Sequence, residues 1–377
     1  MRILVIVLVS LILSACGTTI SRDPVSIREL EAPQVPGIKN ARFWADDTPP
    51  NINELLTERQ QQARAAGLPD RHADLTLSGG AENGAYAAGI LTAWSESGTR
   101  PVFMNVTGVS TGALAAPFAF LGSDYDDELK RLYGGLPPEQ IFERRPITQI
   151  FSKASVKSSG PLRRLLEDYV TDEFLEKIAV QHRRGRRLVI QTVSLDAQRP
   201  VLWDLGRIAA SGAPNARKVF QDALMASAAM PGVFPPVLID VETPFGIRDE
   251  LHVDGGVVSQ SMFVPGWRIP SRFTEGTTLY AIRNGKIDPE AEITKPGIAD
   301  ISKRSLATLI KYQGAVDLGV AYAIGQRQGV RYNATWIGPD FNAPLNEPFD
   351  PEYMQALFDY GYMRFKSGTV WNRKPPG

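Results

Sequence analysis

Ser110 is the residue whose surroundings point first to chemistry. It lies in residues 107–114, TGVSTGAL, between Gly108 and Gly112. The spacing G-x-S-x-G is what a serine nucleophile needs at a sharp turn from a strand into a helix. A serine hydroxyl also needs a base, which is usually a histidine. The chain has only three histidines, which are His72, His182 and His252, and none lies in an evident partner motif.

A second candidate feature is the glycine-rich stretch 77–91, LSGGAENGAYAAGIL. It joins an expected strand (73–78) to an expected helix (83–98), so the free N–H groups of the first helical turn face the loop. Such a turn binds either a permanent anion or the transient oxyanion of acyl transfer.

The glycine-rich stretch has two alternative interpretations. A nucleotide site is disfavoured because Gly79, Gly80 and Gly84 do not form G-x-G-x-x-G and no Gly-Lys-Ser/Thr follows. A purely structural turn remains open. We favour the oxyanion site because Ser110 follows one β-α unit later. An expected strand at 101–108 and helix at 110–122 continue this alternation, which indicates an α/β fold.

Asp254 is the candidate base. It ends the expected strand in segment 251–256 (LHVDGG), and Gly255 and Gly256 after it permit a tight turn and leave access for a substrate. A carboxylate bonded directly to a serine can accept its proton, so no histidine is required. His252 could instead serve a Ser-His-Asp hydrolase, but its place before the aspartate is the wrong chain order for that fold. We expect a structural histidine there and surface positions for His72 and His182.

Four motifs occur in order between residues 73 and 258: SGGAENG, GVSTG, ASAAMPGVFPP and VDGG. Together they resemble the patatin-like phospholipase family of lipid acyl hydrolases, and FDPEYMQALFDYGY resembles a C-terminal helix of bacterial members. The resemblance implies a three-layer α/β/α sandwich with a central mixed sheet and a helical C-terminal extension. It implies Ser110 as nucleophile, Asp254 as base and no metal or cofactor. The implied oxyanion donors are the backbone N–H groups of Gly79, Gly80 and Ala81.

The glycine-rich motif departs from the family pattern at two positions. Ala81 replaces the third glycine, and Asn83 replaces an arginine. An alanine with a negative φ can still donate its N–H. Asn83 removes a positive charge from the oxyanion region, which puts catalytic power and a preference for anionic lipids in question.

The first sixteen residues, MRILVIVLVSLILSAC, have the length and character of a lipoprotein signal peptide. Cys16, the only cysteine, stands where a lipobox would be acylated. We therefore expect cleavage after residue 15 and a bacterial membrane lipoprotein facing the periplasm or the cell surface. Gly17 favours the outer membrane. An ordinary signal peptide or an uncleaved anchor is the alternative.

The composition is that of a globular protein, with 43% hydrophobic and 22% charged residues. Lysine plus arginine equals aspartate plus glutamate at 41 each, which argues against a nucleic-acid binder. We expect a tether and helix over residues 16–70 and one domain over 71–377, with its core at 73–285 and a helical part at 286–377. The cluster of Arg183, Arg184, Arg186 and Arg187 is expected to be a solvated turn, with a headgroup site as the alternative.

Two functions from different classes follow. The first is a membrane-tethered serine acyl hydrolase that cleaves carboxylic esters of lipids through an acyl-enzyme. The second is a non-catalytic surface lipoprotein that keeps the fold for binding or assembly. The sequence does not specify the ester, its regioselectivity or the oligomeric state.

Overall fold

The computed structural model describes residues 22–31, 33–69, 72–144, 157–262 and 267–376. Cys16 and the expected signal peptide lie outside the described residues. None of the helices within those ranges is both long enough and apolar enough to cross a lipid bilayer.

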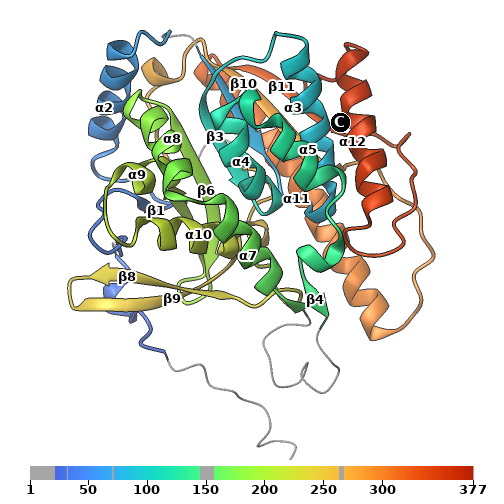
Figure 1. The fold of residues 1–377 in the computed structure, drawn as a ribbon, viewed down its shortest axis with the longest axis horizontal. Coiled ribbons are helices and arrows are strands. Elements are labelled where there is room, and N and C mark those ends of the chain that lie inside the picture. Colours follow the sequence, from blue (N-terminus) through green and yellow to red (C-terminus); the bar gives the residue numbers. More distant parts are fainter. Residues whose placement is uncertain (1–21, 32, 70–71, 145–156, 263–266, 377) are drawn as a thin grey trace, which may run out of the picture.

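A mixed β-sheet forms the centre of the described chain (Figure 1). Four parallel pairings join β6, β3, β2, β10 and β11, whereas β7 and β1 extend the β6 edge in antiparallel fashion. In spatial order these strands are β1 (Arg42–Trp44), β7 (Arg199–Asp204), β6 (Arg187–Ser194), β3 (Phe103–Val109), β2 (Ala73–Leu77), β10 (Thr278–Lys286) and β11 (Arg331–Ile337). A hairpin of β8 (Val237–Thr243) and β9 (Gly246–Asp254) joins the sheet through β6.

Helices cover both faces of this sheet, which confirms the three-layer α/β/α architecture (Figure 1). One face carries α3 (Gly84–Glu96), α4 (Thr111–Leu121) and α10 (Ala216–Ser227). On the other, α11 (Ile298–Gln328) packs against β10 and β11, and α2 (Ile52–Ala65) borders a cavity of about 190 Å³. The remaining elements include α5 (Asp126–Gly134), α7 (Gly160–Tyr169), α8 (Asp172–Arg183), α9 (Leu205–Ala210), α12 (Pro351–Lys366) and the short pair β4 (Glu143–Arg144) and β5 (Lys157–Ser158).

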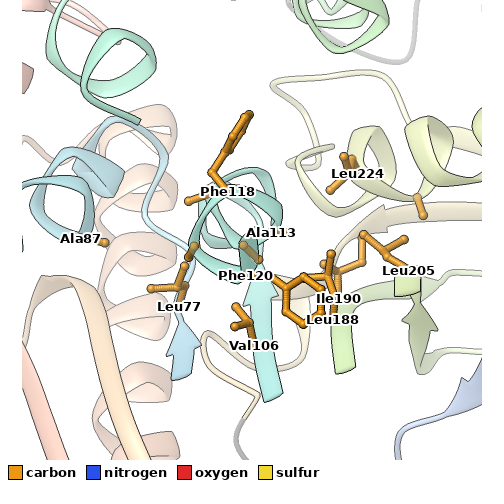
Figure 2. Close-up of a cluster of buried hydrophobic side chains, with 14 of the residues drawn as sticks. Leu77, Ala87, Val106, Ala113, Phe118, Phe120, Leu188, Ile190, Leu205 and Leu224 are labelled. Carbon is orange, nitrogen blue, oxygen red and sulfur yellow. The ribbon is translucent and has the colours of Figure 1, made fainter. Parts of the chain in front are cut away.

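The largest hydrophobic core lies between the sheet and the α3–α4–α10 layer (Figure 2). Strand residues such as Leu77, Val106 and Ile190 meet helix residues such as Ala113 and Phe120 there, all of them fully buried. This packing fixes the turn between β3 and α4, because both elements that flank the turn are buried in the same core.

The C-terminal helix α12 packs closely on α3. A Cβ atom on Gly89 would lie 2.0 Å from the carbonyl oxygen of Phe358, and one on Gly361 would lie 2.5 Å from that of Tyr86. The two glycines therefore allow the helix backbones to approach each other, and α12 holds α3, the helix that follows the glycine-rich loop.

The described part of the expected tether is instead part of the domain. Helix α2 is present as expected, but β1 pairs with β7 at the sheet edge, and Val35 and Ala41 are fully buried. Arg42 is buried as well and pairs with Glu250 of β9 at 2.8 Å. The packed part thus begins well before residue 71, because a few apolar residues within a Pro- and Asp-rich segment suffice to complete a sheet edge.

Candidate active site

Ser110 occupies the turn between β3 and α4 in a strained conformation. Its φ and ψ are 55° and −126°, a combination that residues with a side chain rarely adopt. Its N–H donates to the hydroxyl of Ser227 at 3.0 Å, and that hydroxyl donates to the carbonyl of Gln191 at 2.8 Å. Buried partners therefore hold the nucleophile turn in place, as a nucleophile elbow requires.

Gly108 and Gly112 make this turn possible by close backbone approach. A Cβ atom on Gly112 would lie 2.3 Å from the carbonyl oxygen of Leu77, at the end of β2. One on Gly108 would lie 2.4 Å from the carbonyl oxygen of Gly112. The G-x-S-x-G spacing therefore serves to bring α4 onto the ends of β2 and β3.

Asp254 lies beside the Ser110 turn because its strand, β9, runs toward β3 along the same edge of β6. Strand β3 pairs in parallel with β6 up to Val109 opposite Gln191, and β9 pairs antiparallel with the next residues of β6, ending with Asp254 opposite Thr192. Because β7 occupies the other edge of these β6 residues, β3 and β9 share one edge and meet end to end. Ser110 follows one of these strands and Asp254 ends the other.

The Asp254 carboxylate is buried and hydrogen-bonded at this junction. It accepts the N–H of Gly256 at 2.7 Å, and the Ser110 side chain lies close enough to lower its pKa. Burial raises the pKa of Asp254 to about 6, although both of these contacts oppose the rise. Gly255 is needed beside it, since a Cβ atom there would lie 2.5 Å from the Gln191 carbonyl oxygen.

The glycine-rich loop lies against Ser110. A Cβ atom on Gly79 would be 3.2 Å from the Cβ of Ser110, and one on Gly80 would be 2.1 Å from the carbonyl oxygen of Asn284. The N–H of Gly79 donates to the carbonyl of Gln260 at 3.0 Å. Of the three expected oxyanion donors, Gly79 thus already has an acceptor in the protein.

Ala81 begins a short 3₁₀ turn (Ala81–Asn83) that leads through Gly84 into α3. Its φ is +50°, so the condition of a negative φ is not met, and whether its N–H can donate depends on where the turn points that N–H. The left-handed conformation costs a residue with a side chain about 1–2 kcal/mol, which explains why a glycine suits this position. Within the described chain, the N–H groups of Gly80 and Ala81 have no protein acceptor.

Arg283 of β10 supplies a buried positive charge behind this loop. Its guanidinium donates to the Gly79 carbonyl at 2.9 Å, to Ser78 Oγ at 3.2 Å and to Gln260 Oε1 at 3.3 Å. Burial lowers the pKa of Arg283 to about 10, so it stays charged at neutral pH. No carboxylate of the described chain forms a salt bridge with it. The charge expected to be missing because of Asn83 is therefore present from another strand.

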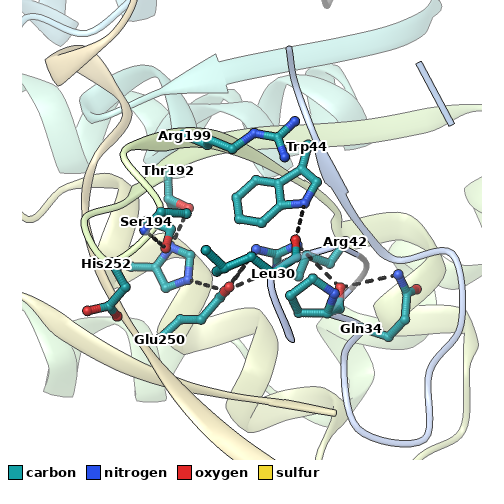
Figure 3. A network of polar contacts seen from close by, with 12 residues as sticks. Leu30, Gln34, Arg42, Trp44, Thr192, Ser194, Arg199, Glu250 and His252 are labelled. Carbon is teal, nitrogen blue, oxygen red and sulfur yellow. Dashed lines mark hydrogen bonds and ion pairs between the residues drawn. The ribbon is translucent and has the colours of Figure 1, made fainter. Parts of the chain in front are cut away.

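His252 is a structural residue and not a partner of Ser110 (Figure 3). Its Nδ1 lies 2.9 Å from Thr192 Oγ1, and its Nε2 lies 3.0 Å from Glu250 Oε2, which also pairs with Arg42. Burial lowers the pKa of His252. Both ring nitrogens are engaged, so the Ser-His-Asp alternative has no geometric support.

Two other sequence expectations are wrong. His182 is buried rather than at the surface, beside Asp204 at 3.6 Å. In the arginine cluster, Arg186 and Arg187 are also largely buried, and Arg186 donates to the carbonyls of Phe103 and Phe120 at 2.7 and 2.6 Å. These groups lie at the amino ends of the parallel strands, whereas Ser110 lies at a carboxyl end.

Three residues of the site were missed from the sequence: Ser227, Gln260 and Arg283. Ser227 stands in a motif already noted for its order, but nothing in that motif shows which atom it would contact. Gln260 donates to the Gly256 carbonyl at 2.8 Å and accepts from Arg283, and so connects the Asp254 turn to the glycine-rich loop. Long-range contacts of this kind leave no local pattern.

A family model described as patatin-like phospholipase matches residues 75–264. A search of curated proteins gives no match. The solved structure of VipD from Legionella pneumophila is 13% identical, with a TM-score of 0.39, over 80% of this chain and 67% of that one. Human GIVD cytosolic phospholipase A2 is 12% identical, with a TM-score of 0.29, over 65% and 49%.

Proposed function

The chain belongs to the patatin-like phospholipase family and is a lipid acyl hydrolase, and on that premise we propose that Ser110 and Asp254 form its catalytic dyad. The observation that carries the proposal is the end-to-end meeting of β3 and β9 on one edge of β6. This meeting brings the Ser110 side chain beside the buried Asp254 carboxylate, close enough to lower its pKa. No histidine of the described chain takes part.

The proposed reaction is a two-step acyl transfer. Ser110 Oγ attacks the ester carbonyl carbon while its proton moves to the Asp254 carboxylate, which gives a tetrahedral oxyanion. The carbon–oxygen bond to the alcohol then breaks, and Asp254 returns the proton to the leaving oxygen. A water molecule then attacks the acyl-enzyme carbonyl carbon and gives its proton to Asp254. The bond to Ser110 Oγ breaks, Asp254 returns the proton to Ser110, and the fatty acid is released.

The oxyanion is assigned to the N–H groups of Gly80 and Ala81. Neither has an acceptor in the described chain, and both lie at the start of the turn that enters α3. Gly79 serves by lacking a side chain next to Ser110 and by presenting its carbonyl to Arg283. Donors fixed in place before the reaction stabilise the oxyanion without a cost of reorganisation.

The test is a fluorophosphonate probe on the full chain in detergent, followed by a panel of phospholipid, lysophospholipid, monoacylglycerol and short-chain esters. Covalent labelling at Ser110 and hydrolysis of at least one ester are expected, and Ser110→Ala should lose both. A folded protein that neither labels nor hydrolyses would support the alternative, a non-catalytic lipoprotein with the same fold.

Membrane attachment through Cys16 is a further part of the proposal. Arg22 is held by Asp249 at 2.7 Å and by Asp196 at 2.6 Å, six residues after Cys16. Six extended residues span about 20 Å, so acylation of Cys16 would keep the domain close to the bilayer. Mass spectrometry of the mature N-terminus should find Cys16 carrying a diacylglyceryl thioether, and an unmodified thiol in membrane-extracted protein would refute the anchor.

A further inference from the structure

Helix α11 presents an apolar stripe to solvent. The stripe, here called the outer stripe, consists of Ile298, Ile301, Leu309, Tyr312, Val316 and Val320. Each of the six is at least 49% exposed, and Ile298 reaches 87%. At about 100° per residue the six fall within an arc of about 100° on one face of the helix, where Ser302 and Ser305 stand between Ile301 and Leu309.

The outer stripe faces away from the protein. The buried residues of α11 are Gly314, Leu318, Ala321 and Gly325, which fall on the opposite side of the helix and pack toward the sheet. None of the residues from Ile298 to Gln313 is buried, and Figure 1 shows the first turns of α11 extending past the end of the sheet. Isolated exposed apolar residues are ordinary, but an aligned row over six turns indicates a binding surface.

The stripe borders the candidate active site. Gln313 donates from Nε2 to the carbonyl of Val258, and Arg283 contacts the Ile310 carbonyl at 3.5 Å. Val257 and Val258 follow Gly256 directly and are 47% and 41% exposed. Gln313, four residues after Leu309 and three before Val316, therefore links the edge of the stripe to the exposed valines beside the Asp254 turn.

We propose that the outer stripe of α11 docks on the lipid surface that holds the substrate; this inference rests on the proposed hydrolase function. The charged residues of its first half, Asp300, Lys303, Arg304 and Lys311, lie off the stripe, as in helices that lie in a membrane interface. A second copy bound to the stripe would cover Val258 and obstruct the turn beside Asp254, whereas a lipid surface there delivers the ester to it.

The first experiment compares soluble and aggregated substrates. Leu309→Ser combined with Val316→Ser should lower hydrolysis of phospholipid in vesicles about tenfold and leave hydrolysis of p-nitrophenyl butyrate within twofold. The matched control is Val102→Ser, which is 66% exposed but lies just before β3, at the far end of the sheet. Equal losses on both substrates, or no loss on vesicles, would overturn the docking surface.

The second experiment locates the stripe directly. An environment-sensitive fluorophore is attached to the cysteine of full-length Leu309→Cys or Val102→Cys protein. Each labelled protein is mixed with phosphatidylethanolamine–phosphatidylglycerol vesicles. The unsubstituted chain, treated in the same way, measures the background labelling of Cys16. The label at residue 309, and not that at 102, should shift to the blue and be quenched by nitroxide lipids. A shift without lipid that grows with protein concentration would assign the stripe to a second copy instead, and no shift would also overturn the inference.

The two experiments separate this inference from the proposed function. An unsubstituted protein that hydrolyses neither substrate would overturn the hydrolase and, with it, delivery of a substrate by the stripe. If the unsubstituted protein is active and the stripe variants hydrolyse vesicle phospholipid as fast as it does, only the docking role of the outer stripe is overturned.

Discussion

Val109 and Asp254 end two strands that share one edge of β6, Val109 opposite Gln191 and Asp254 opposite Thr192. One strand runs parallel to β6 and the other antiparallel, so their ends converge. Ser110, one residue after Val109, consequently faces the Asp254 carboxylate although 144 positions of sequence separate the two. The candidate dyad is thus a product of strand pairing and not of a local motif.

Replacement of Asp254 by asparagine should stabilise the protein at neutral pH. Burial raises the Asp254 pKa from 3.8 to about 6, so the folded state holds the proton more tightly than the unfolded chain. Ionisation therefore costs stability as pH rises from about 4 to about 6, and about 2 pKa units correspond to about 3 kcal/mol. Asp254→Asn should melt at a higher temperature than the unsubstituted chain at pH 8 and not at pH 4. An equal or lower melting temperature at pH 8 would contradict the burial cost.

The fall of kcat/KM at acid pH should follow the protonation of Asp254. Asp254 accepts a proton only when ionised, so kcat/KM should fall about tenfold per pH unit below pH 6. Unperturbed, an aspartate would work well below the reference pKa of histidine, about 6.5. Because burial brings the pKa of Asp254 close to that of a histidine, the pH dependence of kcat/KM does not by itself distinguish the two bases. Constant activity down to pH 4 would nevertheless exclude the raised pKa.

Ala81 should tolerate glycine and not proline. Its φ of +50° is strained for alanine, so Ala81→Gly should leave stability unchanged or raise it by up to about 1 kcal/mol, with activity kept. Ala81→Pro fixes φ near −65° and removes the N–H, so turnover should fall by about 10²–10³ or more. The melting temperature measures the stability of each variant, and p-nitrophenyl ester hydrolysis measures its turnover. A folded proline variant with full turnover would show that Ala81 donates nothing.

Arg283 should matter for turnover more than for substrate binding. Its guanidinium bonds to the Gly79 carbonyl, which belongs to the same peptide unit as the Gly80 N–H, and so polarises that donor. Arg283→Met should lower kcat about 10- to 100-fold with KM within about threefold, and Arg283→Lys should lose less. Arg186→Met is the matched control, since Arg186 is also buried and donates to two backbone carbonyls away from Ser110. Equal losses of kcat in the two methionine variants would mean a structural effect alone.

The sequence predicted the features that are local. The β-α-β-α alternation, the G-x-S-x-G turn and helix α2 are each specified by nearby residues, and the structure has all three. The N-terminal segment was misjudged because β1 is three residues long and gains its stability from β7, not from its own pattern. The same reason hid Arg283 and Ser227, whose partners lie about 200 and 117 residues away. The φ of +50° at Ala81 could not be read from the sequence, because an alanine ordinarily adopts a negative φ.

The most direct test of the dyad compares Asp254→Asn with His252→Gln in ester hydrolysis, with folding checked by circular dichroism. Asparagine keeps the shape of Asp254 but lacks a basic oxygen, so the rate should fall by about 10²–10⁴. His252 bridges Thr192 and Glu250, so glutamine there should cost stability, by about 1–3 kcal/mol, and leave the chemical step within about tenfold. An inactive His252→Gln protein beside an active Asp254→Asn protein, both folded, would contradict the Ser110–Asp254 dyad.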